Sequence, residues 1–592
     1  MSCLFNSYDP YFKQPFGAVR AGQTVHLALC IPEELGYVDP HLVLQKEGKY
    51  DVPVHYRMKF DGQTPHQNHF SVDVVLGDPG LYFYYFDLYT DFRRIVRGAD
   101  NCGVVSWQEG ESWQITVYEP DFQTPECIKG KVFYQIFPDR FCEGVENKPM
   151  PFPDRLYQAD KHAEPFWQPN EIGGHLNEDY FGGDLKGIQL KLPYLHEMGV
   201  DFLYLNPIFE AHSNHRYNTA DYLNVDPLLG TNEEFEVLCR EAAKYGIGIV
   251  LDGVFSHTGS DSRYFNREGR YGEGGAYRDP NSPYRSWYDF DPKYKGGYRS
   301  WWGFETLPEV DEETPSYVEF ITGPGGVIDT WLRRGAAGFR LDVADELPDE
   351  FIEKVRAAVK RVSPEKFLLG EVWEDATTKF GFNKRRTYLL GKGLDSVMNY
   401  PFKNAVLDFV KGKPAEQAMT EILTICEHYP APAMDTALNF LSTHDTERAL
   451  TVIADEPANG RGRAWQSGRC VTGDAYEEGL LRLRMAYAIH LHPAGCALPV
   501  LRRRNRDAGL PRPVQPRLLL LEQPRRAAPP GAGTAGAAPP HLRGFPHRPA
   551  AGPACRGRHP ALPAGGQGGD RGDHRQPHRA YHRGDPCQRQ EH

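Results

Sequence analysis

Several apolar segments of this sequence end in side chains that can donate, accept or share a proton. Seven such residues follow four segments in chain order: Asp252, His257, Arg340, Asp342, Glu371, His444 and Asp445. Each could form a structural ion pair, because a charge beside an apolar strand is costly to bury without a partner. Four segments that end in the same way favour one shared site over separate ion pairs.

Two carboxyl groups held close together can cut a glycosidic bond. A protonated carboxyl donates to the leaving oxygen, while an ionised carboxylate attacks or stabilises the positively charged sugar. Neighbouring strands lie about 4.8 Å apart, and carboxyls about 5–5.5 Å apart retain the anomeric configuration. Asp342 and Glu371 end neighbouring predicted strands, so this pair fits the retaining class.

The surroundings of this pair suit the same chemistry. Arg340 lies two residues before Asp342, on the same side of a strand, and a nearby cation lowers the pKa of an acid. The ring of Trp373 offers low-dielectric surface that can raise the pKa of Glu371. Three further residues could hold sugar hydroxyls: Asp445, His257 and His444.

Apolar segments alternate with helical ones over residues 126–490. Thr231 and Glu234, three residues later, form a capping-box signature at the start of one helix. Seven buried strands are expected, at residues 131–137, 200–209, 246–255, 338–343, 367–373, 394–402 and 436–445. The pattern predicts a (β/α)8 barrel that lacks its eighth strand, with a small lobe inserted at about 256–312. A doubly wound sheet would alternate in the same way, so periodicity leaves both folds open.

Residues 1–125 have the period-two alternation of β-strands. It is clearest in segments 24–31, 69–76, 80–92 and 112–118. An N-terminal β-sandwich is therefore predicted. We expect the aromatic residues of 80–92 to fill its core rather than to form a sugar-binding platform.

The overall composition excludes several classes of protein. The 592 residues carry a net charge of −12 and a mean hydropathy of −0.55, which argues against nucleic-acid or anionic-membrane partners. No apolar run reaches the roughly 18 residues of a membrane span. The 11 cysteines form no CxxC pair, and the N-terminus lacks the pattern of a secretory signal. We expect a cytoplasmic protein with free thiols.

The composition changes abruptly at residues 491–592. This tail is rich in Arg and Pro and contains no Lys, and Phe545 and Tyr581 are its only aromatic residues. Three interpretations stay open: a disordered extension, a basic arm that binds nucleic acid, and translation in a shifted reading frame.

Four motifs in chain order resemble those of the α-amylase superfamily of glycoside hydrolases. They are DGVFSH (252–257), GFRLDVADE (338–346), GEVWEDA (370–376) and LSTHDTERAL (441–450). Segments 182–188, 215–230 and 302–317 resemble further parts of the same family. The resemblance spans roughly 131–490 and is closest to the neopullulanase, cyclomaltodextrinase and maltogenic amylase group. Members of that group also carry an N-terminal β-sandwich.

The resemblance implies a role for each matching position. Asp342 would be the nucleophile, Glu371 the general acid/base and Asp445 the stabiliser of the transition state. Asp252 would lie behind them or near a calcium ion. The positions that would bind substrate are His215, Tyr217, His257, Arg340, His444, Trp373 and Phe255, with the last two on the acceptor side.

Such a reaction requires no cofactor, but the resemblance includes a structural Ca²⁺ near the first strand. Gly182 and Asp184 match that position, with Asn147 in a loop nearby. The ligand pattern at 141–149 departs from that of the family. Asp184 could instead cap the helix that follows it.

The eighth strand of the family carries a Tyr-Tyr-Gly-Asp-Glu-like segment, which is missing after residue 489. Permissible codons for residues 492–524, read one base over, can encode such a segment. We therefore expect a frameshift near 489–492, and a disordered tail at 491–592. A barrel without strand eight would leave two open strand edges and would compromise activity.

The resemblance implies a retaining hydrolase that cuts α-glucosidic bonds in maltodextrins, cyclodextrins or pullulan through a covalent glycosyl-aspartate. One alternative is an α-glucan transglycosylase of the branching or 4-α-glucanotransferase type. Another is an inactive, truncated homologue. An α-glucan oligosaccharide is the expected partner, with no nucleic acid and no membrane. Relatives often pair through the sandwich, so a homodimer is compatible with the sequence.

Overall fold

The computed structural model describes residues 3–48, 52–89, 92–146, 148, 155–161, 163, 165, 177–454, 461, 465–466, 470–491 and 495–498. The chain divides into two units, Met1–Ala537 and Ala538–His592. All described residues belong to the first unit. The hypothesis of a frameshifted, disordered tail therefore concerns mostly residues outside the described part and stays a prediction.

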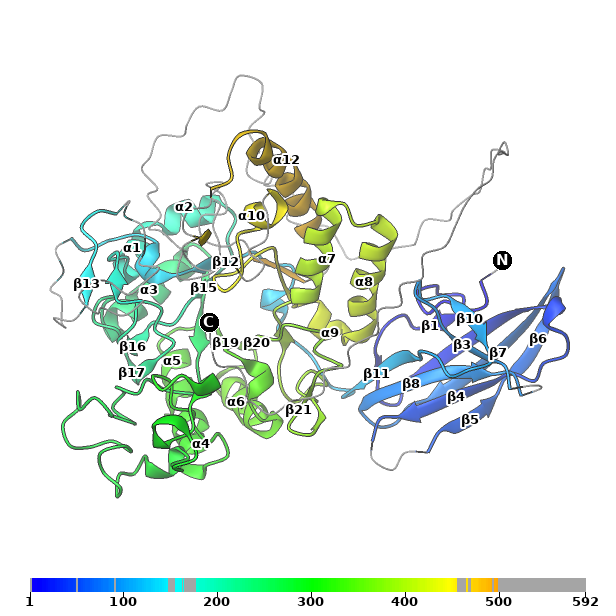
Figure 1. Ribbon diagram of the computed structural model, residues 1–592, viewed down its shortest axis with the longest axis horizontal. Coiled ribbons are helices and arrows are strands. Elements are labelled where there is room, and N and C mark those ends of the chain that lie inside the picture. Colours follow the sequence, from blue (N-terminus) through cyan, green and yellow to red (C-terminus); the bar gives the residue numbers. More distant parts are fainter. Residues whose placement is uncertain are drawn as a thin grey trace. The chain divides into compact units, whose positions relative to one another are not determined.

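The N-terminal region forms two packed β-sheets (Figure 1). One has the order β1-β3-β7-β6; the other has the order β10-β9-β8-β11-β2, with β4 and β5 joined through β8. The strands are β1 (Lys13–Gln14), β2 (Val19–Arg20), β3 (Thr24–Pro32), β4 (His41–Lys46), β5 (Val54–Arg57), β6 (Lys59–Thr64), β7 (Gln67–Val75), β8 (Gly80–Asp87), β9 (Arg94–Arg97), β10 (Gly103–Ser106) and β11 (Trp113–Tyr118). Tyr84, Phe86 and Trp113 are buried between the sheets, so the expectation of core aromatic residues is confirmed for them.

A curled sheet of parallel strands follows. The ladder runs β12-β15-β18-β19-β20-β23, and β24 pairs with β25 in parallel. The strands are β12 (Phe133–Ile136), β15 (Phe202–Leu205), β18 (Gly248–Gly253), β19 (Gly338–Leu341), β20 (Phe367–Gly370), β23 (Ser396–Val397), β24 (Leu438–Phe440) and β25 (Cys496–Leu498). Parallel bridges Met398–Leu438 and Val132–Ala497 join the two groups into a ring of eight strands.

The expectation that the eighth strand is lost is therefore wrong. Cys496 and Leu498 are buried inside the ring, while the backbone of Ala497 pairs on both sides. Strand pairing uses backbone N–H and C=O groups, so an extended segment with two apolar inward side chains closes the sheet. The Tyr-Tyr-Gly-Asp-Glu sequence is not needed for this pairing.

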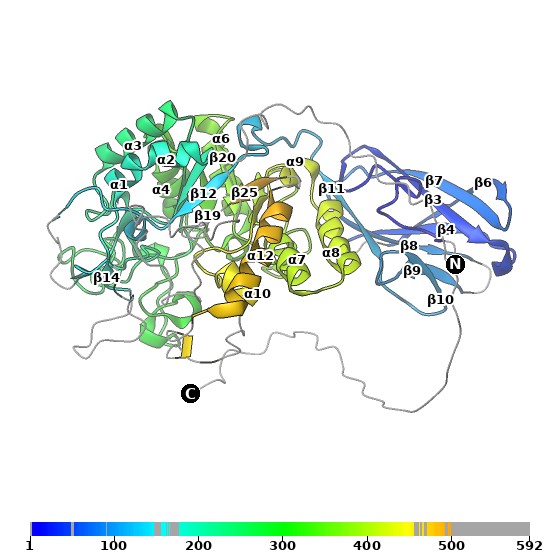
Figure 2. The ribbon, with the colours of Figure 1, turned by 90° about the horizontal axis from the view of Figure 1, so that it is seen from above.

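Helices cover the outside of the curled sheet (Figure 2). They are α1 (Leu185–Leu190), α2 (Leu192–Glu197), α3 (Asn232–Lys244), α4 (Pro315–Thr322), α5 (Val327–Arg333), α6 (Asp349–Val362), α7 (Tyr400–Lys411), α8 (Ala415–His428), α9 (Ala431–Met434), α10 (Ala449–Ala454) and α12 (Gly473–His490). The capping box of Thr231 and Glu234 begins α3 as predicted. Shorter strands pair outside the curled sheet: β13 (Leu156–Tyr157), β14 (Asp179–Tyr180), β16 (Phe209–Ala211), β17 (Thr219–Val225), β21 (Phe380–Gly381) and β22 (Lys384–Arg385).

Residues 256–312, between β18 and α4, contain three short 3-10 turns, at Arg285–Trp287, Lys295–Gly297 and Trp301–Gly303. Aromatic side chains organise the segment, and Tyr264 and Trp287 lie in the same apolar core as the barrel helices. The segment is therefore anchored to the barrel rather than built around a core of its own.

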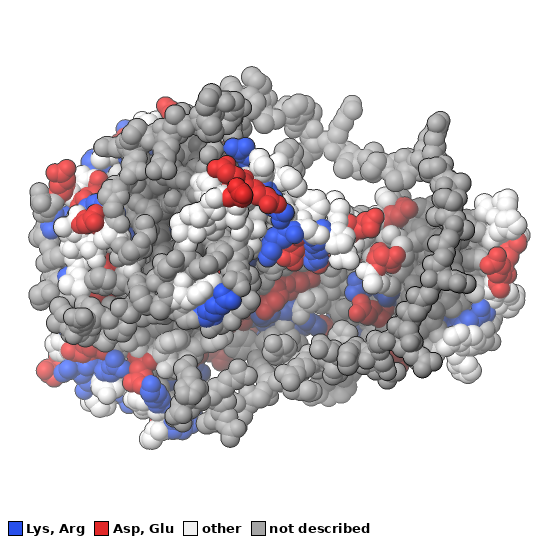
Figure 3. Space-filling model, turned by 45° about the horizontal axis from the view of Figure 1, so that its top comes forward, with Lys and Arg blue, Asp and Glu red and all other residues white. Residues whose placement is uncertain are grey.

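Buried polar contacts tie the sandwich to the barrel region. Lys13 Nζ lies 2.6 Å from Glu427 Oε1 of α8, and Gln114 Nε2 donates to Thr377 Oγ1 at 3.0 Å. On the face in Figure 3, the charged side chains of described residues are intermixed in sign. Among the described residues, no helix is long and apolar enough to cross a bilayer.

Candidate active site

The guanidinium of Arg340 lies at the centre of the predicted site. It projects from β19, directly opposite Asp252 of β18. Its Nη1 lies 2.6 Å from Asp252 Oδ1 and 2.8 Å from Asp342 Oδ1. Its Nη2 lies 2.7 Å from Glu371 Oε2. Asp342 and Glu371 follow the ends of neighbouring strands and meet on one cation, so they face the same space.

A buried hydrogen-bond network fixes this cation from behind. Tyr204 and Tyr217 donate their hydroxyls to Asp252 Oδ2 at 2.7 and 2.8 Å. Asn206 Nδ2 donates to the hydroxyl of Tyr217 at 2.9 Å. Asp252 is therefore saturated by donors, and its role is to hold Arg340 and Tyr217 in place.

Besides its ion pair with Arg340, Glu371 accepts from three donors. The backbone N–H of Val343 donates to Oε2 at 3.0 Å, and Val343 adopts left-handed backbone angles, with φ of 40°. Trp373 Nε1 and the Tyr400 hydroxyl donate to Oε1 at 3.2 and 3.3 Å. The Trp373 and Tyr400 rings stack with centroids 4.5 Å apart. A β-branched residue in this backbone region is strained, and here the strain aims an N–H at the carboxyl.

His444 and Asp445 approach from the strand on the other side. His444 Nε2 lies 2.5 Å from the Tyr217 hydroxyl and 3.1 Å from Asp445 Oδ2. Gln135 Nε2 lies 2.7 Å from the other ring nitrogen. The side chain of Asp445 is 22% exposed, so it can reach a ligand.

Two further predicted histidines border the network. The backbone N–H of Tyr217 donates to His215 Nδ1 at 3.1 Å. His257 is fully buried, and its Nε2 has no hydrogen-bond partner among the described residues. Burial lowers the pKa of His257 to about 4, so the ring is neutral at pH 7.

The cluster contains more acids than cations. Burial raises the pKa of Asp342 well above its usual value, with Arg340 opposing the rise and Glu371 adding to it. Burial also raises the pKa of Glu371, again opposed by Arg340. One buried guanidinium cannot compensate three ionised carboxylates, so this crowding favours the protonated form of a carboxyl. The expected lowering of the Asp342 pKa by Arg340 is present, but burial outweighs it, and Asp252 and Glu371 share the same guanidinium.

Phe255 is not at the mouth of the site. It has no exposed surface and packs against the rings of Tyr222 and Phe339. The prediction that Phe255 lines the acceptor side is therefore wrong: its ring points into the core two residues after β18 ends. Trp373 is 46% exposed and remains available to a ligand beside Glu371.

Sequence reasoning missed several contributors to the network. They are Gln135, Tyr204, Asn206, Val343 and Tyr400. Gln135 and Tyr204 carried a usable signal, because a polar group in the middle of an apolar strand needs a buried partner. The backbone angles of Val343 carried none.

The predicted metal residues lie elsewhere, beside β12. Asn147 lies outside the described residues. Gly182 and Asp184 lie together, but the ammonium of Lys148 contacts both of them. Among the described residues, no group of three or more His, Cys, Asp or Glu side chains could hold a metal ion.

Comparison with known proteins identifies the family to which this chain is similar. The family described as "Alpha amylase, catalytic domain" matches residues 135–466. An amylopullulanase from Thermoanaerobacter thermohydrosulfuricus is 34% identical over 522 residues, which cover 77% of this chain and 34% of that protein. Neopullulanase 2 from Thermoactinomyces vulgaris is 36% identical over 349 residues, which cover 57% of this chain and 54% of that protein. The chain thus spans between about one third and one half of the length of these relatives.

Two solved structures have a similar fold. The cyclic α-maltosyl-(1→6)-maltose hydrolase from Arthrobacter globiformis is 28% identical, with a TM-score of 0.54 over 66% of this chain and 77% of that one. The type III pullulan hydrolase from Thermococcus kodakarensis has a TM-score of 0.55 over 86% of this chain and 82% of that one. At 24% identity, this second likeness supports the fold alone.

Proposed function

The chain belongs to the alpha-amylase family, and on that premise we propose that it is a retaining glycoside hydrolase acting on α-glucans. The observation that carries the proposal is the meeting of Asp342 and Glu371 on one guanidinium. Both acids point into one space from neighbouring strands, as a double-displacement reaction requires.

In the first step, Asp342 Oδ attacks the anomeric carbon as the bond from that carbon to the leaving oxygen breaks. Glu371 transfers its proton to that oxygen, and a glycosyl-aspartate ester forms. In the second step, Glu371 takes a proton from water, the water oxygen bonds to the anomeric carbon, and Asp342 leaves as carboxylate. Two inversions retain the configuration.

The crowding of three carboxyls around one guanidinium supports this assignment. Burial and crowding of acids favour one protonated carboxyl, which is the state that the first step consumes. When Asp342 becomes an ester it loses its charge, and Arg340 is then shared by fewer anions. Glu371 can therefore ionise and act as the base of the second step.

Three side chains are suited to hold the sugar next to the bond that breaks. Tyr217, stacked on His444 with 5.6 Å between ring centroids, offers a fixed aromatic face. The neutral ring of His257 can donate to or accept from a hydroxyl. Asp445, beside His444, can accept from two hydroxyls and stabilise the positive charge of the transition state.

The substrate class that we propose is maltodextrin, cyclodextrin or pullulan. The names of the relatives, which include neopullulanase, cyclomaltodextrinase and amylopullulanase, support it. The α-1,4 and α-1,6 linkages differ at the acceptor side of the bond. Trp373, which is half exposed beside Glu371, is the side chain that we expect on the acceptor side.

Transfer to a sugar acceptor is the second candidate, and the exposure of Trp373 favours it. An aromatic face beside the acid/base can bind a sugar as well as exclude water. The ratio of transfer to hydrolysis products from maltotriose, followed over acceptor concentration, distinguishes the two.

The test uses Glu371→Gln, Asp342→Asn and the control Glu350→Gln, which removes an exposed ion pair between Glu350 of α6 and Lys384 of β22. On maltotriose, both active-site variants should lose at least about 10³-fold in kcat. With an aryl glycoside that needs no acid, Glu371→Gln alone should give a burst of aryl alcohol, because the ester still forms. Wild-type turnover by Glu371→Gln, or a first product of inverted configuration, would refute the proposal.

A further inference from the structure

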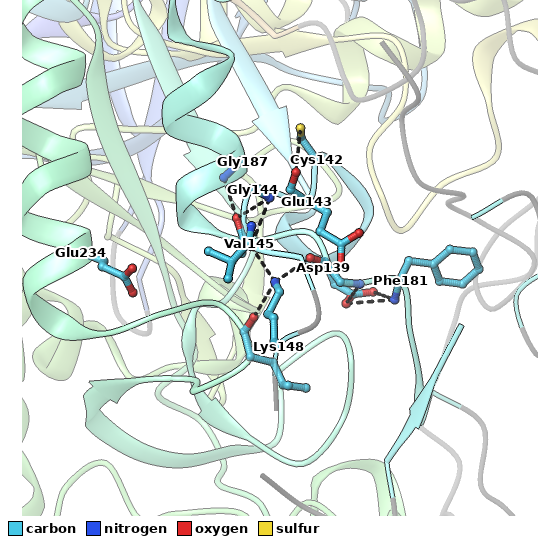
Figure 4. Close-up of polar contacts among 12 residues, drawn as sticks. Asp139, Cys142, Glu143, Gly144, Val145, Lys148, Phe181, Gly187 and Glu234 are labelled. Atoms are coloured by element: carbon cyan, nitrogen blue, oxygen red, sulfur yellow. Dashed lines mark hydrogen bonds and ion pairs between the residues drawn. The ribbon is translucent and has the colours of Figure 1, made fainter. Parts of the chain in front are cut away.

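A buried ammonium lies beside β12, outside the proposed catalytic site. The side chain of Lys148 is 11% exposed. Its Nζ donates to Gly182 O at 2.6 Å, to Asp184 Oδ2 at 2.6 Å and to Leu228 O at 3.2 Å (Figure 4). The cation thus lies among three oxygens from segments up to 80 residues away.

The Asp184 carboxylate joins this cation to the backbone on both sides. It caps α1 by accepting from the N–H of Gly187, and it accepts from the N–H groups of Gly144 and Val145 at 3.0 Å. Gly182 has φ of +83°, a conformation that favours glycine, and its carbonyl faces the ammonium. The loop after β12, the start of α1 and the turn before α3 therefore meet at one charge.

Three described carboxylates around this loop each have a cation from the chain. Arg140 Nε lies 2.9 Å from Asp139, Lys161 Nζ lies 3.2 Å from Glu143, and Lys148 holds Asp184. These three carboxylates therefore offer no unpaired charge to a divalent ion, and the other described acid of the loop, Glu146, is exposed. Calcium needs six to eight oxygens at about 2.3–2.6 Å, and a second cation next to the Lys148 ammonium would be repelled.

We infer that Lys148 is a covalently tethered substitute for a metal ion. It occupies the position at which Gly182 and Asp184 would bind calcium, and it supplies the same cross-link between loop and helix. The stability of this chain is then independent of calcium. This inference does not depend on the proposed catalytic function.

Thermal unfolding of the full chain, in excess EGTA and in millimolar CaCl₂, tests the inference. Wild type should give one melting temperature in both. Lys148→Met should melt several degrees lower in both, because it leaves a buried carboxylate without a cation. Lys186→Met, which changes an exposed lysine of α1, is the matched control and should match wild type.

Lys148→Asn gives the converse measurement. It vacates the position and adds an amide oxygen, so calcium should raise its melting temperature above that in EGTA. Three results would each overturn the inference. The melting temperature of wild type could fall in EGTA, or Lys148→Met could melt at the same temperature as Lys186→Met. The third result is a Lys148→Asn variant whose melting temperature is the same in calcium and in EGTA. Calorimetric titration of wild type with CaCl₂, expected to give no binding heat, decides the question even if the variants fail to fold.

Discussion

Replacing Arg340 by Met should cost more stability than any other single change in the site. The guanidinium is 1% exposed and contacts three carboxyls at 2.6–2.8 Å. Removing one partner of a buried ion pair costs about 3–5 kcal/mol, and here the change leaves a buried excess of acid. We therefore expect Arg340→Met to lose at least about 3 kcal/mol of unfolding free energy at pH 7.

The pH dependence of this loss has a definite sign. Arg340 lowers the pKa values of Asp342 and Glu371 against the rise caused by burial, so its removal lets both rise further. The folded variant then binds more protons than its unfolded chain, and its stability falls as pH rises. The deficit relative to wild type should be smaller at pH 5 than at pH 8.

Urea unfolding at pH 5, 7 and 8, followed by tryptophan fluorescence, measures both effects. Arg385→Met is the control: its ion pair with Glu47 is partly exposed and should be worth no more than about 1 kcal/mol. Arg340→Lys should fall between the two, since an ammonium cannot fork to three carboxyls. If Arg340→Met unfolds like Arg385→Met at all three pH values, the reasoning about the shared cation is wrong.

Three further predictions concern other parts of the chain. Lys13→Met should lose about 3–5 kcal/mol in urea unfolding because it leaves the buried Glu427 without a cation; full wild-type stability would contradict this. Burial lowers the pKa of His490 to about 4, below the unfolded value of 6.5, so its contribution is lost as pH falls from 6.5 towards 4. His490→Gln should recover up to about 3 kcal/mol of the loss between pH 7 and pH 4, and an unchanged pH profile would refute this. Trp373→Ala should lower transfer relative to hydrolysis roughly tenfold in product analysis with maltotriose; an unchanged ratio would show that the ring does not hold the acceptor.

The sequence predicted the parts of the fold that depend on local pattern. Strand ends at Asp252, Asp342 and Glu371 were visible because apolar runs stop there. The sharing of Arg340 among three acids was not visible, because it depends on strand register, which one sequence does not state. The three oxygens around Lys148 could not be predicted for a related reason, because they lie 34 to 80 residues away in the sequence.

Strand eight was missed because the expectation followed side-chain identity. A family segment was absent, and the strand was taken to be absent with it. Three residues, Cys496–Leu498, satisfy the backbone on both sides. The family resemblance likewise placed Phe255 on the acceptor side of the site. Phe255 lies two residues after β18 ends, where side chains no longer alternate between the two faces of the sheet.

The bridge between Val132 and Ala497 also has a temporal consequence. These residues are 365 positions apart, and the ribosome adds roughly 5–20 residues per second. Strand β12 therefore waits many seconds for its last neighbour, and until then one edge of β12 and one edge of β24 are unpaired in the nascent chain. Synthesis that stops before residue 496 would leave that gap permanent, so pulse-labelled products arrested there should be captured by chaperones far longer than those that pass it.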